Sequence, residues 1–140
     1  MYVKICGLRR VEDALMINEF ENIKYAGLVF ADTKRKVTLE RAAEIKRALR
    51  ADIKTVGVFT ETSAEKINEI ADTVGLDICQ LHSNETNDDC KKINTAVWKA
   101  IRIKDNKSIN EADGFKDCVG FVLDKYKAKE YGGTGEAFDW

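Results

Sequence analysis

One cysteine of the sequence lies where proteins built from strands and helices often carry their chemistry. The short run 2–5 precedes Cys6, Gly7 follows it, and a helical pattern begins soon afterwards. Reactive groups of α/β proteins stand at the carboxyl ends of strands that lead into helices. Cys6 is therefore a candidate reactive thiol, although cysteine is also among the residue types most often buried as inert packing.

Charged and polar residues end other apolar runs in the same way. His82, Arg102 and Asp124 each stand at the end of such a run, and the basic loop 34–36 follows another. Each has an ordinary structural alternative. The carboxylate could form a turn or a helix cap, the histidine could be a hydrogen-bonded structural residue, and the basic loop could be a solvated surface.

The elements that must position these residues form one repeating pattern. Apolar runs without strict alternation, typical of strands buried on both faces of a parallel sheet, predict strands at 3–6, 25–30, 53–59, 78–82, 97–103 and 118–124. Helical periodicity predicts helices at 11–20, 39–49, 63–74, 86–93 and 108–115. Ser63 is the expected N-cap of the third helix. The chain is thus a series of βα units.

Composition excludes several classes of partner. The chain has 140 residues, with 23 basic against 24 acidic side chains and a formal net charge of -1, which offers no footprint for nucleic acid or an anionic membrane. No apolar stretch approaches the roughly 20 residues that cross a bilayer. Acidic residues at Glu12 and Asp13 replace the apolar region of a secretory signal. We expect a cytoplasmic protein of one domain.

Cysteine spacing predicts reduced thiols and no metal site. The four cysteines are Cys6, Cys79, Cys90 and Cys118. None forms a C-x-x-C pair, and only one histidine is present to join a metal site.

Two architectures accept six βα units. A doubly wound open sheet closes its core within about this length, whereas a (β/α)₈ barrel has eight strands and typically about 250 residues. Length alone favours the open sheet. The candidate residues do not discriminate, because both folds carry their sites at the carboxyl ends of strands.

A series of short segments carries a resemblance from end to end. They are VKICG (3–7), EDA (12–14), GLVF (27–30), KR (34–35), VGVF (56–59), QLH (80–82), KAI (99–101), LD (123–124), YGGTG (131–135) and FDW (138–140). In order and spacing the chain resembles the phosphoribosylanthranilate isomerase family, (β/α)₈-barrel enzymes of tryptophan biosynthesis. The match covers the first six strands. The resemblance implies a single partial barrel domain over 1–140 that lacks the last two βα units.

The resemblance implies a reaction and two catalytic residues. The reaction is the Amadori rearrangement of N-(5-phosphoribosyl)anthranilate, which needs no cofactor. Cys6 matches the family's general base, and the start of the next helix near Gly7 and Leu8 could assist its thiolate. Asp124 matches the general acid that protonates the furanose oxygen.

The same resemblance implies the substrate contacts. Arg35 would bind the anthranilate carboxylate through its planar fork, and His82 would line the substrate pocket. The family usually has glycine after this histidine, so Ser83 predicts a different turn there. The loop that would close over the substrate contains Gly132, Gly133 and Gly135.

The expected partner is a small phosphorylated molecule, although barrels commonly bind its phosphate with the loops after strands seven and eight. Open edges at the first and sixth strands invite self-association or completion by another chain. We therefore expect these 140 residues alone to be a poor isomerase. The alternatives are a non-catalytic βα module that binds a partner or a small anion, and a receiver-type open sheet. A receiver would need an acidic cluster and a phosphoacceptor aspartate at its strand ends, where the first strand offers Cys6.

Overall fold

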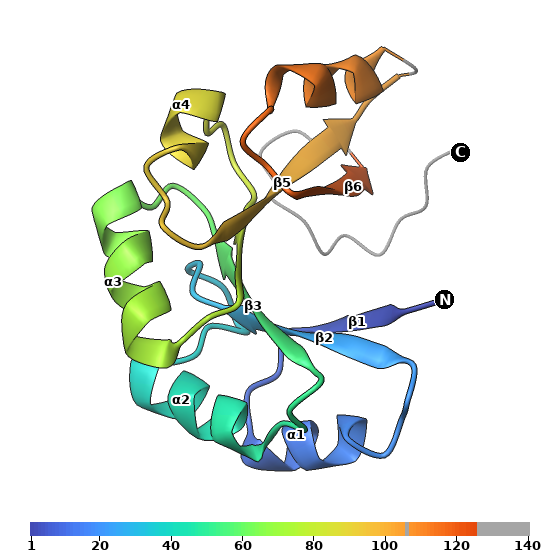
Figure 1. Cartoon of the computed structure of the whole chain (residues 1–140), viewed down its shortest axis with the longest axis vertical. Helices are drawn as coiled ribbons and strands as arrows, with labels where there is room; N and C mark the ends of the chain where they lie inside the picture. Colours follow the sequence, from blue (N-terminus) through green and yellow to red (C-terminus); the bar gives the residue numbers. More distant parts are fainter. Residues whose placement is uncertain (106, 126–140) are drawn as a thin grey trace.

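Six parallel strands form one curved sheet. A computed structural model describes residues 1–105 and 107–125. The strands are β1 (Val3–Cys6), β2 (Ile23–Val29), β3 (Lys54–Phe59), β4 (Ile78–Leu81), β5 (Ala96–Ile103) and β6 (Gly120–Lys125). They lie side by side in chain order and curve into part of a barrel (Figure 1). All six strands predicted from the sequence are confirmed, with ends shifted by a few residues at most.

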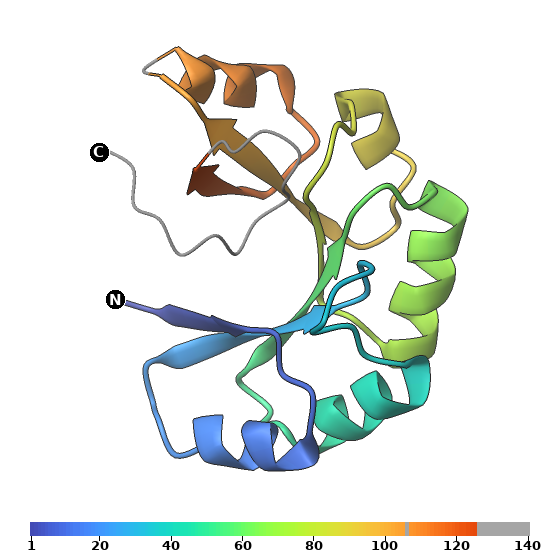
Figure 2. The ribbon, with the colours of Figure 1, turned by 180° about the vertical axis from the view of Figure 1, so that it is seen from behind.

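Helices connect successive strands and cover the outer face of the curve. They are α1 (Val11–Ile17), α2 (Leu39–Ala48), α3 (Ala64–Val74), the short α4 (Asn87–Cys90) and a 3-10 helix, η1 (Ser108–Gly114). Figure 2 shows the same arrangement from behind, with β1 and β6 at the two ends of the curve. A doubly wound sheet carries helices on both faces. That alternative is therefore wrong, and the incomplete barrel is confirmed.

Alternation along the strands divides their side chains between two faces. Leu28 of β2 and Leu81 of β4 point outward into a buried core, where they join Ile45 of α2 and Ile67 of α3. The intervening residues point to the inner face, because successive side chains of a strand alternate. Polar residues at those inner positions are therefore brought together from separate strands.

Caps define the ends of the helices. Ser63 accepts a hydrogen bond from the backbone N–H of Lys66 at 3.3 Å, so the predicted N-cap of α3 is confirmed. Gly75 ends the same helix in the left-handed region with φ 74°. Two predicted helices are several residues shorter than expected, because 11–20 ends at Ile17 and 86–93 contains four helical residues. The segment predicted as a helix over 108–115 forms the 3-10 helix η1.

Within the described part of the chain, no helix combines the length and the apolar character needed to cross a membrane.

Candidate active site

Cys6 is exposed at the carboxyl end of β1, beside β2. The backbone N–H groups of Gly7 and Leu8 both donate to the carbonyl of Gly27, at 2.9 and 3.1 Å. Helix α1 begins only at Val11, so the expectation that Gly7 and Leu8 start a helix beside the thiol is wrong. Those N–H groups extend the strand pairing instead. A Cβ at Gly27 would lie 2.7 Å from Sγ of Cys6, so the glycine leaves the thiol its room.

Arg35 lies beside this cysteine. Gly7 has φ +91°, which favours glycine, and a Cβ there would lie 2.7 Å from Cδ of Arg35. The Nη1 atom of Arg35 is 3.5 Å from the carbonyl oxygen of Cys6. The guanidinium is exposed, so its fork is open to a carboxylate. The structure thus brings two of the predicted site residues together.

His82 and Asp124 form the second pair. Nε2 of His82 lies 3.1 Å from Oδ2 of Asp124, which joins the residue after β4 to β6. Burial lowers the pKa of His82, although the nearby Asp124 carboxylate opposes that shift. The other carboxylate oxygen, Oδ1, accepts the backbone N–H of Lys125 at 2.9 Å. Both oxygens of the predicted acid therefore have polar partners, the backbone N–H of Lys125 and the imidazole ring of His82.

Two further polar residues reach this pair from the inner face. Nζ of Lys4 donates to Oε1 of Gln80, and Nε2 of Gln80 lies 3.4 Å from Nδ1 of His82. Burial lowers the pKa of Lys4, partly offset by the nearby Cys6 thiol. Sequence reasoning assigned no role to Lys4 or Gln80. The signal was their spacing, because each lies two residues before a predicted site residue and so shares its face of a strand.

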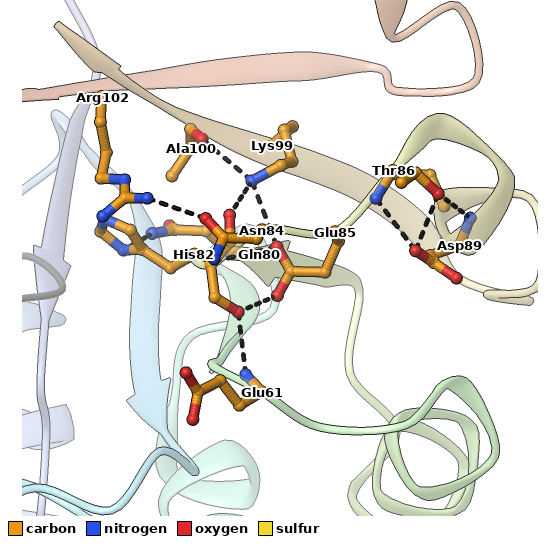
Figure 3. Close-up of polar contacts among 12 residues, drawn as sticks. Glu61, Gln80, His82, Asn84, Glu85, Thr86, Asp89, Lys99, Ala100 and Arg102 are labelled. Atoms are coloured by element: carbon orange, nitrogen blue, oxygen red, sulfur yellow. Dashed lines mark hydrogen bonds and ion pairs between the residues drawn. The ribbon is translucent and has the colours of Figure 1, made fainter.

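The turn after β4 is held by charged groups, as Figure 3 shows. The hydroxyl of Ser83 accepts the backbone N–H of Glu61 at 2.9 Å and donates to Glu85. Nζ of Lys99 lies 3.2 Å from Glu85 and 2.8 Å from the carbonyl of Ser83. Arg102 donates to the side chain of Asn84 at 2.8 Å. Ser83 therefore belongs to a polar network that glycine could not make.

A cavity of about 320 Å³ lies beside the Ser83 turn, between α3 and α4. Its lining includes Glu61, Ile67 and Glu85. None of the candidate catalytic residues lines it, so we locate the chemistry at the strand ends.

The other thiols fit their structural interpretation. Burial raises the pKa of Cys79 and of Cys90 to about 12, which disfavours their reactive thiolates. The predicted loop residues Gly132, Gly133 and Gly135 lie outside the described residues. Among residues 1–105 and 107–125, no three His, Cys, Asp or Glu side chains gather as a metal site would require.

Comparison with known proteins supplies a family. The model of the N-(5'phosphoribosyl)anthranilate (PRA) isomerase family matches residues 3–140. The N-(5'-phosphoribosyl)anthranilate isomerase of Caldanaerobacter subterraneus subsp. tengcongensis is 44% identical over 139 residues, which cover 99% of this chain and 68% of that protein.

Solved structures agree. The crystal structure of phosphoribosyl anthranilate isomerase from Thermotoga maritima superposes with a TM-score of 0.87 at 34% identity, covering 100% of this chain and 68% of the other. A phosphoribosyl anthranilate isomerase in complex with reduced 1-(o-carboxyphenylamino)-1-deoxyribulose 5-phosphate gives a TM-score of 0.82 at 31% identity, covering 90% of this chain and 66% of the other. The chain belongs to the N-(5'-phosphoribosyl)anthranilate isomerase family.

Proposed function

We propose that Cys6 and Asp124 are the base and the acid with which this isomerase of tryptophan biosynthesis converts N-(5-phosphoribosyl)anthranilate to 1-(2-carboxyphenylamino)-1-deoxyribulose 5-phosphate. One observation carries the assignment. Cys6, His82 and Asp124 all stand at or near the carboxyl ends of parallel strands, and those ends lie on the same side of the curved sheet. A single small substrate bound at these strand ends can touch residues from several strands.

Asp124 performs the first proton transfer. Its carboxyl group gives a proton to the furanose oxygen, the bond from that oxygen to C1 breaks, and the nitrogen lone pair forms a C1=N iminium. The carboxylate that remains accepts hydrogen bonds from His82 and from the backbone of Lys125. These donors stabilise the charge that the step creates on Asp124.

Cys6 performs the second transfer. Its thiolate removes the proton from C2 of the sugar, and the electron pair of that C–H bond forms C1=C2 as the iminium electrons return to nitrogen. The resulting enaminol gains a proton at C1 and loses one from the C2 hydroxyl, which gives the ketone. Arg35, 3.5 Å from the carbonyl of Cys6, binds the carboxylate of the anthranilate ring. The rearrangement is redox-neutral, because C2 is oxidised as C1 is reduced and only protons pass to and from the acid and the base, so the proposal requires no cofactor.

The anthranilate fluorescence of the substrate tests these roles in a turnover assay. Cys6→Ala and Asp124→Asn should each lower kcat by about 10²- to 10⁴-fold, the usual contribution of one general acid or base. Arg35→Ala should raise KM more than it lowers kcat, because it removes an anchor. Cys118→Ala is the control, since it deletes a thiol away from the site. Unchanged turnover in both Cys6→Ala and Asp124→Asn would show that the acid and the base are other residues.

We also propose that the partner at the sheet edges is a second copy of this chain. Large apolar side chains are exposed near both edges, including Ile5 in β1 and Val119 and Phe121 at β6. Sedimentation at several concentrations should reveal association that Phe121→Lys weakens. Phe20→Lys removes an exposed aromatic residue before β2 and should leave the association unchanged. If Phe121→Lys and Phe20→Lys change the association equally, the copies do not associate through the β6 edge.

We infer that the chain is one domain and works in the cytoplasm. One buried cluster runs from Leu8 to Val97 and joins α1, α2 and α3 to the sheet. The four cysteines are free thiols, as is usual in a reducing compartment.

A further inference from the structure

We propose that Lys4 and Gln80 are positioning residues that hold the single histidine as the neutral tautomer with its proton on Nε2, so that His82 presents an N–H to Asp124. The three contacts Lys4–Gln80, Gln80–His82 and His82–Asp124 join β1, β4 and β6 across the inner face. The effect of this relay on catalysis depends on the proposed function of Asp124. The tautomer itself does not.

Lys4 determines which way the amide of Gln80 faces. A lysine ammonium has three donors and no acceptor, so its partner on Gln80 must be the carbonyl oxygen Oε1. Gln80 is buried, which leaves its amide little freedom to turn over. Its NH₂ group therefore faces Nδ1 of His82, 3.4 Å away.

Gln80 in turn determines the proton position on the imidazole. An amide NH₂ can only donate, so Nδ1 of His82 must accept and carries no proton. The proton of the neutral ring then sits on Nε2, 3.1 Å from Oδ2 of Asp124. Each hydrogen bond from Lys4 to Asp124 thus has a defined donor and a defined acceptor, which the preceding hydrogen bond in the series determines.

An imidazolium would break this arrangement. Protonated Nδ1 would point an N–H at the NH₂ of Gln80, and two donors would face each other. The charged groups around the ring are Asp124 on β6, which favours the cation, and Lys99 on β5 and Lys4 on β1, which oppose it.

The relay has a consequence for the acid. With Nε2–H on Oδ2 and the backbone N–H of Lys125 on Oδ1, the plane of the Asp124 carboxyl group is fixed from both sides. A fixed carboxyl group keeps its proton directed at one position. Gln80 acts on the reaction through His82 and touches no reacting atom in this scheme, whereas Lys4 also interacts with the thiol of Cys6.

Nitrogen NMR of the full chain tests the tautomer directly. Because the sequence has one histidine, ¹⁵N-labelled histidine gives unambiguous signals for the two ring nitrogens. At pH 7.5 the wild-type chain should show an unprotonated Nδ1 and a protonated Nε2. In Gln80→Leu, which removes the donor, and in Lys4→Met, which frees the amide to turn over, the two nitrogens should approach the averaged shifts of a tautomer mixture.

Gln80→Glu reverses the polarity and gives the sharpest contrast. A carboxylate can accept from Lys4 and from a protonated Nδ1 together, so the titration midpoint of His82 should rise by about one pH unit or more, tenfold in the protonation equilibrium. Turnover should fall with the same pH dependence while KM changes little. Asn68→Asp is the matched control, an amide-to-acid change on α3 that should leave the histidine signals unchanged.

The outcomes separate this inference from the proposed function. A wild-type ring protonated on Nδ1, or a Gln80→Glu midpoint that does not move, would overturn the relay. The expected spectra together with full turnover in Asp124→Asn would support the relay and refute the acid.

Discussion

Gly27 has the most restricted position next to the proposed base. A Cβ there would lie 2.7 Å from Sγ and 2.9 Å from Cα of Cys6, and the backbone contact cannot move aside. We expect Gly27→Ala to displace Cys6, to lower kcat, and to cost about 1–3 kcal/mol of stability through overpacking. Thermal unfolding and the turnover assay measure the two effects.

Gly114 provides the matched control. A Cβ on this glycine of η1 meets no atom within 4 Å, so Gly114→Ala should leave both activity and stability nearly unchanged. If the two alanine variants behave alike, the close approach of β2 to Cys6 has no influence on the thiol.

Residues could be predicted singly but not in their contacts. Cys6, Arg35, His82 and Asp124 came from strand ends and the family resemblance. The contact of Lys4 with Gln80 joins residues 76 positions apart, and no local pattern can reveal such a pairing. Only the curvature of the sheet brings the inner positions of β1 and β4 within reach of each other.

At the scale of elements, the turn after β4 depends on a buried ion pair. Lys99 and Glu85 are 4% and 11% exposed at their side chains, and Nζ lies 3.2 Å from Oε2. Lys99→Met leaves Glu85 buried without its cation, which should cost about 3–5 kcal/mol of unfolding free energy. Urea denaturation measures the loss.

Two companion variants make the result specific to burial. Lys66→Met removes an exposed pair with Glu69 on α3 and should cost less than about 1 kcal/mol. The double change Lys99→Met with Glu85→Leu should recover part of the stability, because no charge is left buried. Costs that simply add in the double variant would contradict coupling between Lys99 and Glu85.

Strands were predicted better than helices for a physical reason. A short apolar run is enough to predict a buried strand. The length of a helix also depends on how many successive turns keep their backbone hydrogen bonds, which apolar periodicity does not show. Thr86 caps α4 and forms a capping box with Asp89, but the helix ends at Cys90 after a single turn. Periodicity over 86–93 and 108–115 could not distinguish one turn or a 3-10 helix from a longer α-helix.

At the scale of the molecule, chain length misled where the βα repeat did not. A length of 140 residues favours an open sheet, yet the strands follow chain order and the helices cover one face. Open sheets and barrels share the same βα unit, so periodicity cannot separate them. The family resemblance distinguished the barrel from the open sheet, because it rests on the order of motifs along the whole chain and not on any single βα unit.

The free energy of unfolding should depend on pH because His82 is neutral in the folded chain. Burial lowers the pKa of His82, so as pH falls the unfolded chain takes up this proton first. Stability should therefore be complete above the ordinary histidine pKa of about 6.5, decline below it, and stop declining once the folded pKa is passed. Urea unfolding between pH 5 and pH 8 measures this slope.

Carboxylates act in a separate window, which makes the assignment to His82 possible. Burial raises the pKa of Asp77, but hydrogen bonds from Thr55 outweigh burial and lower it. Hydrogen bonds with Thr86 lower the pKa of Asp89 to about 2. Their stabilisation is present above the ordinary aspartate pKa of about 3.9 and is lost below it. His82→Gln should thus remove the slope near pH 6 and keep the acid one. A slope near pH 6 that persists without the only histidine would mean that another group stays neutral in the folded chain.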